Sequence, residues 1–95
     1  MAIHPVLIAG EWLKAQSSRS FSSENPALGA KLPGEYPISD WADCDAALAA
    51  ATAAAAVLRA TSPDRIAAFL DAYAGRIEAR KAEIVDVANA ETGLP

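Results

Sequence analysis

Cys44 is the only thiol in this chain of 95 residues and its first candidate for nucleophilic chemistry. A catalytic cysteine needs a neighbouring base or cation that favours the thiolate. The flanking residues Asp43 and Asp45 would have the opposite effect. Cys44 also belongs to the apolar stripe of a predicted helix, where a free cysteine behaves as a small hydrophobic residue. We therefore expect Cys44 to be a buried structural residue.

His4 is the only histidine and the only candidate for a general base of that type. It lies near the N-terminus, where chains are commonly disordered. One histidine without a second ligand does not make a metal site. No serine lies in a Gly-x-Ser-x-Gly turn, and a serine triad would also need a histidine partner. The residues therefore indicate neither a metal site nor a serine nucleophile.

The glycines do not form a recognised phosphate-binding loop. Gly29 and Gly34 have the spacing of such a loop, but Glu35 follows where a lysine is required. The Gly-x-Gly-x-x-Gly pattern of dinucleotide-binding turns is also missing from the sequence. We expect no catalytic residue and no cofactor-binding residue in this chain.

Composition narrows the class of protein and its partners. Hydrophobic residues make up 53% of the chain and aromatic residues only 6%, which favours Ala-rich helices over a β sandwich. The net charge of −4 argues against nucleic-acid binding and against an electrostatic membrane anchor. So large an apolar share in so short a chain predicts that a partner surface covers part of it.

The location of the protein is predicted from the same features. A single cysteine cannot form an internal disulfide, and no basic segment precedes an apolar run as in a signal peptide. The Ala-rich residues 46–56 are only weakly apolar, and two aspartates lie at their edge, so we do not predict a membrane span. The cytoplasm is the expected compartment.

Residues 1–39 form a predicted leader of turns and short strands. They contain four of the six prolines and three of the five glycines. A two-residue turn at Ala9 and Gly10 predicts a hairpin between residues 6–8 and 11–13. A short exposed strand is expected around Phe21. A turn at residues 25–29 and extended pieces at 31–32 and 36–38 complete the leader.

Residues 40–95 have a helical pattern, with Ser39 or Asp40 as the first N-cap. Ser62 and Pro63 predict a second helix start, and Gly93 predicts the final C-cap. Arg80 and Lys81 mark a kink or a break, so two or three helices are expected. Helices joined by short loops should pack antiparallel as a helical hairpin. The apolar stripe of the first helix contains Trp41, Cys44, Leu48, Ala51, Ala55 and Leu58.

Two further groups of side chains have structural interpretations. Trp12, Trp41 and Tyr73 are expected to anchor packing and not to stack on a ligand. The mixed charges near the end of the second helical segment predict a solvated face with a few weak ion pairs. The predicted fold class is an α+β fragment, mostly α, with a short β leader before the helices.

Read in order, the motifs resemble the N-terminal region of the aldehyde dehydrogenase superfamily. Each motif is short, but their order and spacing extend over the whole chain. They are L-I-A-G-E-W at residues 7–12, N-P-A-L-G at 25–29, D-C-D-A-A at 43–47, the helix start at 59–65 and A-E-T-G-L-P at 90–95. Leu28 and Leu94 depart from the threonine and lysine usual in the family. The segment at residues 33–37 and the ending at 90–95 look like those of the branch of α-ketoglutaric semialdehyde (2,5-dioxopentanoate) dehydrogenases.

The resemblance implies a much longer, oligomeric enzyme of α/β fold that uses NAD or NADP. A cysteine thiolate would attack the aldehyde, hydride would pass to the nicotinamide, and water activated by a glutamate would hydrolyse the thioester. None of the family's catalytic motifs matches residues of this chain, and Cys44 does not match the nucleophile. Some members hold a monovalent cation at positions that match the backbone of Glu24 and the side chain of Glu91. With a third ligand absent, no bound ion is expected.

Two hypotheses follow. In the first, the chain is the N-terminal segment of an NAD(P)-dependent aldehyde dehydrogenase, inactive alone, whose partner is the rest of its own enzyme. Its role would be scaffolding, with the helices covering one side of the cofactor domain. In the second, it is a stand-alone, non-enzymatic helical module that binds another protein. The first predicts an exposed apolar face, whereas the second predicts a self-sufficient core.

Overall fold

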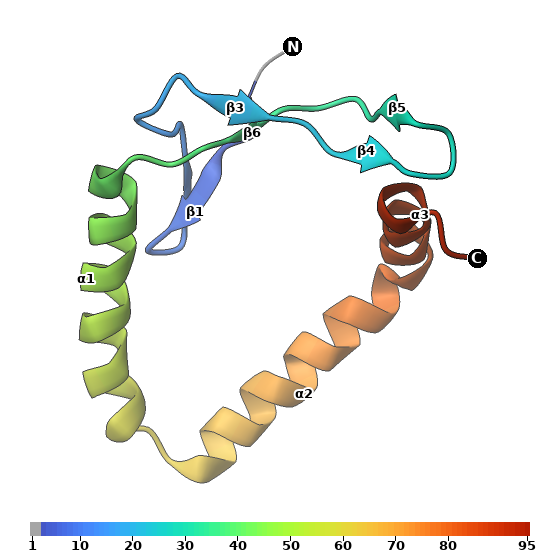
Figure 1. Ribbon diagram of the computed structural model, residues 1–95. Coiled ribbons are helices and arrows are strands. Elements are labelled where there is room, and N and C mark those ends of the chain that lie inside the picture. Colours follow the sequence, from blue (N-terminus) through green and yellow to red (C-terminus); the bar gives the residue numbers. More distant parts are fainter. Residues whose placement is uncertain (1–2) are drawn as a thin grey trace.

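The computed structural model describes residues 3–95 as short strands followed by three helices (Figure 1). The strands are β1 (Val6–Ile8), β2 (Glu11–Leu13), β3 (Ser20–Phe21), β4 (Glu24–Asn25), β5 (Ala30–Lys31) and β6 (Tyr36–Pro37). The helices are α1 (Trp41–Arg59), α2 (Pro63–Ala79) and α3 (Lys81–Thr92). The predicted fold class, mostly α with a short β leader, is confirmed.

The hairpin of β1 and β2 forms where the sequence predicts it. Leu7 lies opposite Trp12 in the antiparallel register. Ala9 and Gly10 both have positive φ, 52° and 81°, as a two-residue turn of type I′ requires. Glycine adopts this conformation freely, whereas Ala9 does so at a cost of roughly 1–2 kcal/mol. The register of the strands therefore depends on a turn with one strained residue.

The turn at residues 25–29 joins β4 to β5 and is held by Asn25. The side-chain oxygen of Asn25 accepts from the amide of Ala27 at 3.0 Å, and its carbonyl accepts from the amide of Gly29 at 2.8 Å. Gly29 has φ of +61°, which a residue without a Cβ adopts at little cost. The predicted turn is therefore confirmed, with the side chain of Asn25 as its main local support.

The strands form three separate two-stranded sheets: β1 with β2, β3 with β6, and β4 with β5. The pairing of β3 with β6 places Phe21 opposite Tyr36, and their rings lie 5.8 Å apart. Phe21 is exposed, as expected. Two-stranded sheets are at best marginally stable in water. The leader therefore depends on surfaces outside its own sheets.

The first two helix starts differ in how they are capped. Asp40 occupies the N-cap of α1, but its side chain makes no capping bond. Its Oδ1 instead accepts from Arg19 Nη2 at 3.3 Å, which ties the leader to the start of α1. At α2, Ser62 Oγ accepts from the amide of Arg65 at 3.3 Å, and Pro63 is the first helical residue. The predicted cap at Ser62 is confirmed. Asp40 lies at the predicted N-cap position, but its side chain does not make the expected capping hydrogen bond.

The cap at Ser62 can be tested on a peptide of residues 60–82. We expect Ser62→Ala to weaken helix formation by about 1 kcal/mol, because the amide of Arg65 loses its acceptor. Circular dichroism measures the helix content. Thr61→Ala is the matched control, since it removes a hydroxyl one residue earlier that does not cap α2. Equal losses in the two peptides would contradict the assigned cap.

The break between α2 and α3 lies at Arg80, as predicted. Arg80 has φ of −110° and ψ of 15°, outside helical values, and it is both the C-cap of α2 and the N-cap of α3. Its guanidinium donates to Glu83 at 2.6 and 3.1 Å. This bond and the positive charge lower the pKa of Glu83, which therefore stays ionised to lower pH. Both groups are exposed, so the pair is one of the expected weak surface pairs.

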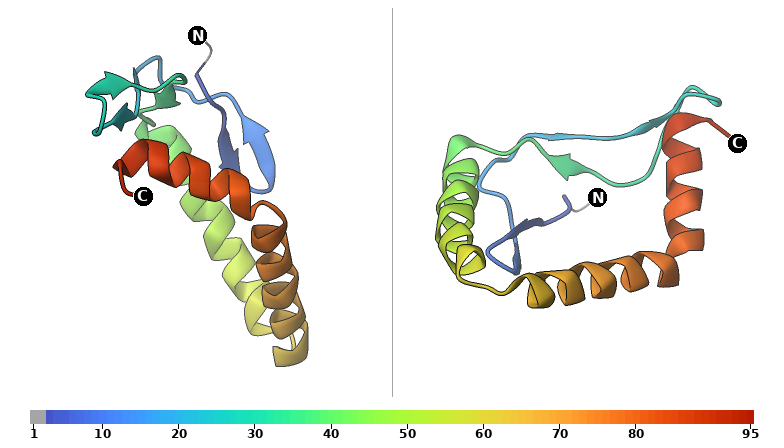
Figure 2. Two further views of the ribbon diagram at one scale, coloured as in Figure 1. Left: turned by 90° about the vertical axis from the view of Figure 1, so that its right-hand side faces the viewer. Right: turned by 90° about the horizontal axis from the view of Figure 1, so that it is seen from below.

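The helices form an open frame and do not pack on one another. The chain reverses between α1 and α2, but the two helices diverge into a V, and α3 returns to the leader (Figures 1 and 2). α1 contacts β1 and α3 contacts β4, whereas no extensive contact joins α1 to α2. The expected packing of an antiparallel helical hairpin is therefore wrong for this chain, because a short loop reverses the chain without bringing the helix faces together.

The frame encloses almost no core. Among residues 3–95, the buried ones are Ala15, Ser17 and Asp43, and no large side chain is fully buried. The radius of gyration is 17.1 Å, against about 13 Å for a compact domain of this size. The exposed surface is 7596 Å², against about 5,200 Å² for a compact protein of 9.8 kDa. The predicted exposure of apolar surface is confirmed.

Helix α1 is long and apolar enough to cross a membrane by length and composition alone. This single observation is weak evidence, because a core helix of a soluble protein meets the same condition. Much of its hydropathy comes from alanine, and Asp43 and Asp45 lie near its start. The absence of a membrane span therefore stays a prediction.

Candidate functional site

Cys44 is exposed, so its predicted burial is wrong. It lies on α1 at a small cavity of about 180 Å³ between the helix and the β1–β2 hairpin. The lining residues are Val6, Leu7, Ile8, Ser39, Asp43, Cys44 and Ala47. The residues of the predicted apolar stripe lie on α1, but Trp41, Leu48 and Leu58 of that stripe are exposed. The lining contains no lysine, arginine or histidine that could support a thiolate.

His4 is held in place and is not part of a disordered terminus, contrary to expectation. Its ring stacks on Tyr36, with centroids 4.7 Å apart and planes at 9°. Its amide donates to the carbonyl of Glu35 at 2.8 Å. Within residues 3–95, no group of three or more histidine, cysteine or acidic side chains is placed to hold a metal ion. The geometry gives His4 a role in anchoring the first residues to β6.

Asp43 is the buried polar residue whose role the sequence did not reveal. Its Oδ2 accepts from the amide of Gln16 at 3.0 Å, across 27 positions of sequence. A carboxylate in the first turn of a helix is ordinarily explained by its attraction to the positive end of the helix dipole. The side chain of Asp43 instead ties the segment after β2 to α1. The one signal that could have indicated this was its place in the D-C-D-A-A motif.

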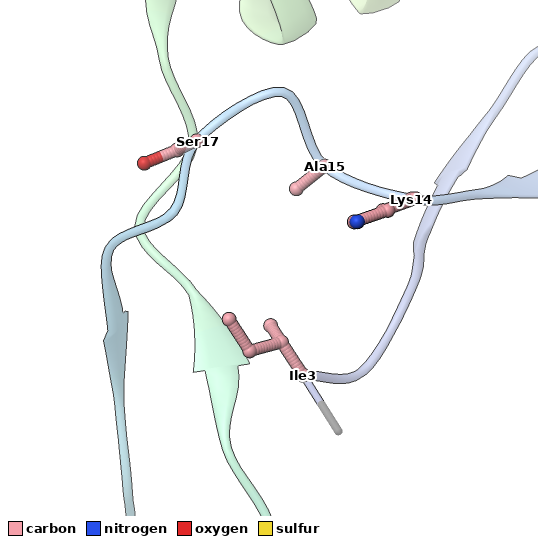
Figure 3. A pocket seen from close by; sticks show the side chains of 4 residues that line it. All are labelled: Ile3, Lys14, Ala15 and Ser17. Carbon is pink, nitrogen blue, oxygen red and sulfur yellow. The ribbon is translucent and has the colours of Figure 1, made fainter. Parts of the chain in front are cut away.

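A cavity of about 360 Å³ lies beside the bond between Gln16 and Asp43. Ile3, Lys14, Ala15 and Ser17 line it, and Figure 3 shows Ile3, Lys14 and Ala15 extending into the same space. Among the described lining residues, Lys14 is the one with a charged side chain. These four residues do not provide the paired groups that general acid–base chemistry requires.

The end of α3 meets the turn at residues 25–29, and this junction closes the frame. Ser23 Oγ donates to Glu91 Oε1 at 3.4 Å, although the two residues are 68 positions apart. A Cβ placed on Gly93 would lie 3.2 Å from the amide nitrogen of Ala27 and 3.3 Å from Pro26 Cγ. Gly93 also has φ of +68° and caps α3, as predicted. A side chain at position 93 would therefore crowd the turn and strain the backbone.

The junction brings together the two positions that the family resemblance suggested for a cation. Glu24 lies in β4, which contacts α3, and Glu91 lies beside Ser23. A cavity of about 200 Å³ adjoins Glu91, and its lining is Ser23, Leu32, Pro33, Tyr36, Val87, Ala90 and Glu91. The contacts at this junction join the leader to α3.

The aromatic side chains expected to anchor packing are largely uncovered. Trp12 is 69% exposed, Trp41 is 71% exposed and Tyr73 is 58% exposed. Within residues 3–95 they therefore do not anchor a core, contrary to expectation. Each is the kind of residue that contributes most when buried in an interface.

The family profile that matches this chain and the individual proteins similar to it point to the same family. The sequence profile of the Aldehyde dehydrogenase family matches residues 12–95. A "Probable aldehyde dehydrogenase" of Mycobacterium tuberculosis is 36% identical over 88 residues, which cover 93% of this chain and 17% of that protein. A "Vanillin dehydrogenase" of Pseudomonas fluorescens is 34% identical over 89 residues, or 94% of this chain and 18% of that protein. No solved structure matches. The chain thus spans less than a fifth of the length of these relatives.

Proposed function

Since this chain belongs to the aldehyde dehydrogenase family, we propose that it is the N-terminal segment of an NAD(P)-dependent enzyme that oxidises an aldehyde to a carboxylate. The observation that carries this proposal is the family match over residues 12–95. The relatives' much greater length supports a parent enzyme several times longer than this chain. The segment is inactive alone in this proposal, and the rest of its own enzyme is its partner.

The role of the segment is to form a scaffold. Its residues do not fit a nicotinamide cofactor, because the dinucleotide loop is missing from the sequence and, among the described residues that line the 360 Å³ cavity, Lys14 is the one with a charged side chain. The cofactor contacts, the nucleophile and the base would therefore come from the remainder of the enzyme. The junction of Ser23, Ala27, Glu91 and Gly93 supports this role, since it joins distant segments without presenting reactive groups.

The aldehyde substrate is the narrower part of the proposal. The segments at residues 33–37 and 90–95 favour α-ketoglutaric semialdehyde, but the names of the relatives do not support that branch. The vanillin dehydrogenase adds an aromatic aldehyde as a second candidate. We also propose that the full-length enzyme is a homo-oligomer located in the cytoplasm. Its cofactor in this proposal is NAD or NADP.

An activity measurement on the full-length enzyme tests the proposal. With α-ketoglutaric semialdehyde, vanillin and simple aliphatic aldehydes, we expect reduction of NAD⁺ or NADP⁺, followed by absorbance of the reduced nicotinamide. Cys44→Ala should leave kcat within about two-fold of the parent, because the nucleophile lies elsewhere and changes away from an active site have small effects. Failure with every aldehyde would refute the dehydrogenase proposal. Complete loss of activity in Cys44→Ala would overturn the exclusion of Cys44 as nucleophile.

The stand-alone interaction module is the competing proposal. It would need a core of its own, and the three buried residues among residues 3–95 do not supply one. The open frame therefore favours the enzyme segment.

A further inference from the structure

We draw no further inference here: the strongest candidate, the cavity of about 360 Å³ lined by Ile3, Lys14, Ala15 and Ser17, specifies no ligand, because Lys14 is the one charged side chain among these described residues and the Ser17 hydroxyl already accepts from the amide of Arg19.

Discussion

Expressed alone, residues 1–95 are expected to unfold without a cooperative thermal transition and to self-associate. The reason is the missing core: the buried residues of the described chain are Ala15, Ser17 and Asp43, whose side chains are small or polar. Burial of large apolar side chains supplies most of the free energy that offsets chain entropy. The exposed apolar side chains on each helix would instead contact other copies.

Differential scanning calorimetry and size-exclusion chromatography measure this behaviour, with the full-length enzyme as the control. In calorimetry, the full-length enzyme should show a cooperative transition and the isolated chain should show none. In chromatography, the isolated chain should elute in a broad profile that depends on its concentration. A rigid monomer with a sharp transition at high temperature would contradict the expectation. It would favour the stand-alone interaction module, and a reproducible binding partner would then be sought.

Gly93→Ala is expected to weaken the junction between α3 and the leader by about 2 kcal/mol. A residue with a Cβ pays roughly 1–2 kcal/mol for a left-handed conformation, and Gly93 has φ of +68°. The added Cβ would also crowd the backbone of Ala27 at 3.2 Å and the ring of Pro26 at 3.3 Å. These atoms belong to a proline-containing turn, so they cannot move aside as the end of a flexible side chain would.

The effect can be measured by hydrogen exchange of α3 amides in the full-length enzyme. A loss of about 2 kcal/mol corresponds to roughly thirty-fold faster exchange through local opening. Gly75→Ala is the matched control, because no atom lies within 4 Å of a Cβ at that position in α2. It should stabilise α2 by about 0.5–1 kcal/mol. Similar changes at both glycines would contradict the proposed packing of Gly93.

The local elements of this protein are determined by the sequence alone. The type I′ turn at Ala9 and Gly10, the Asn25 turn, the Ser62 cap and the Gly93 cap all lie where the residues predict them. Each depends on interactions between residues only a few positions apart, such as a side chain accepting from a nearby amide. The order of these local motifs also identified the family before any tertiary contact was known.

The contacts between distant segments were decided only by the tertiary structure. The bond from Gln16 to Asp43, the pairing of β3 with β6 and the contact of Ser23 with Glu91 link residues that carry no local sign of their partners. The family resemblance brought Glu24 and Glu91 to attention, but only the fold placed the two segments against each other. Residue type predicts hydrogen-bonding capacity, whereas the identity of the partner depends on the path of the whole chain.

The exposure of Cys44 is likewise a matter of contacts between distant segments, which the local sequence does not determine. Helical periodicity identifies which side of α1 is apolar, because side chains three and four residues apart share a face. It does not state whether a covering element is present, and in the described chain that face is mostly open. The sequence thus determines the elements and their apolar sides, while burial depends on tertiary contacts that this chain alone does not supply.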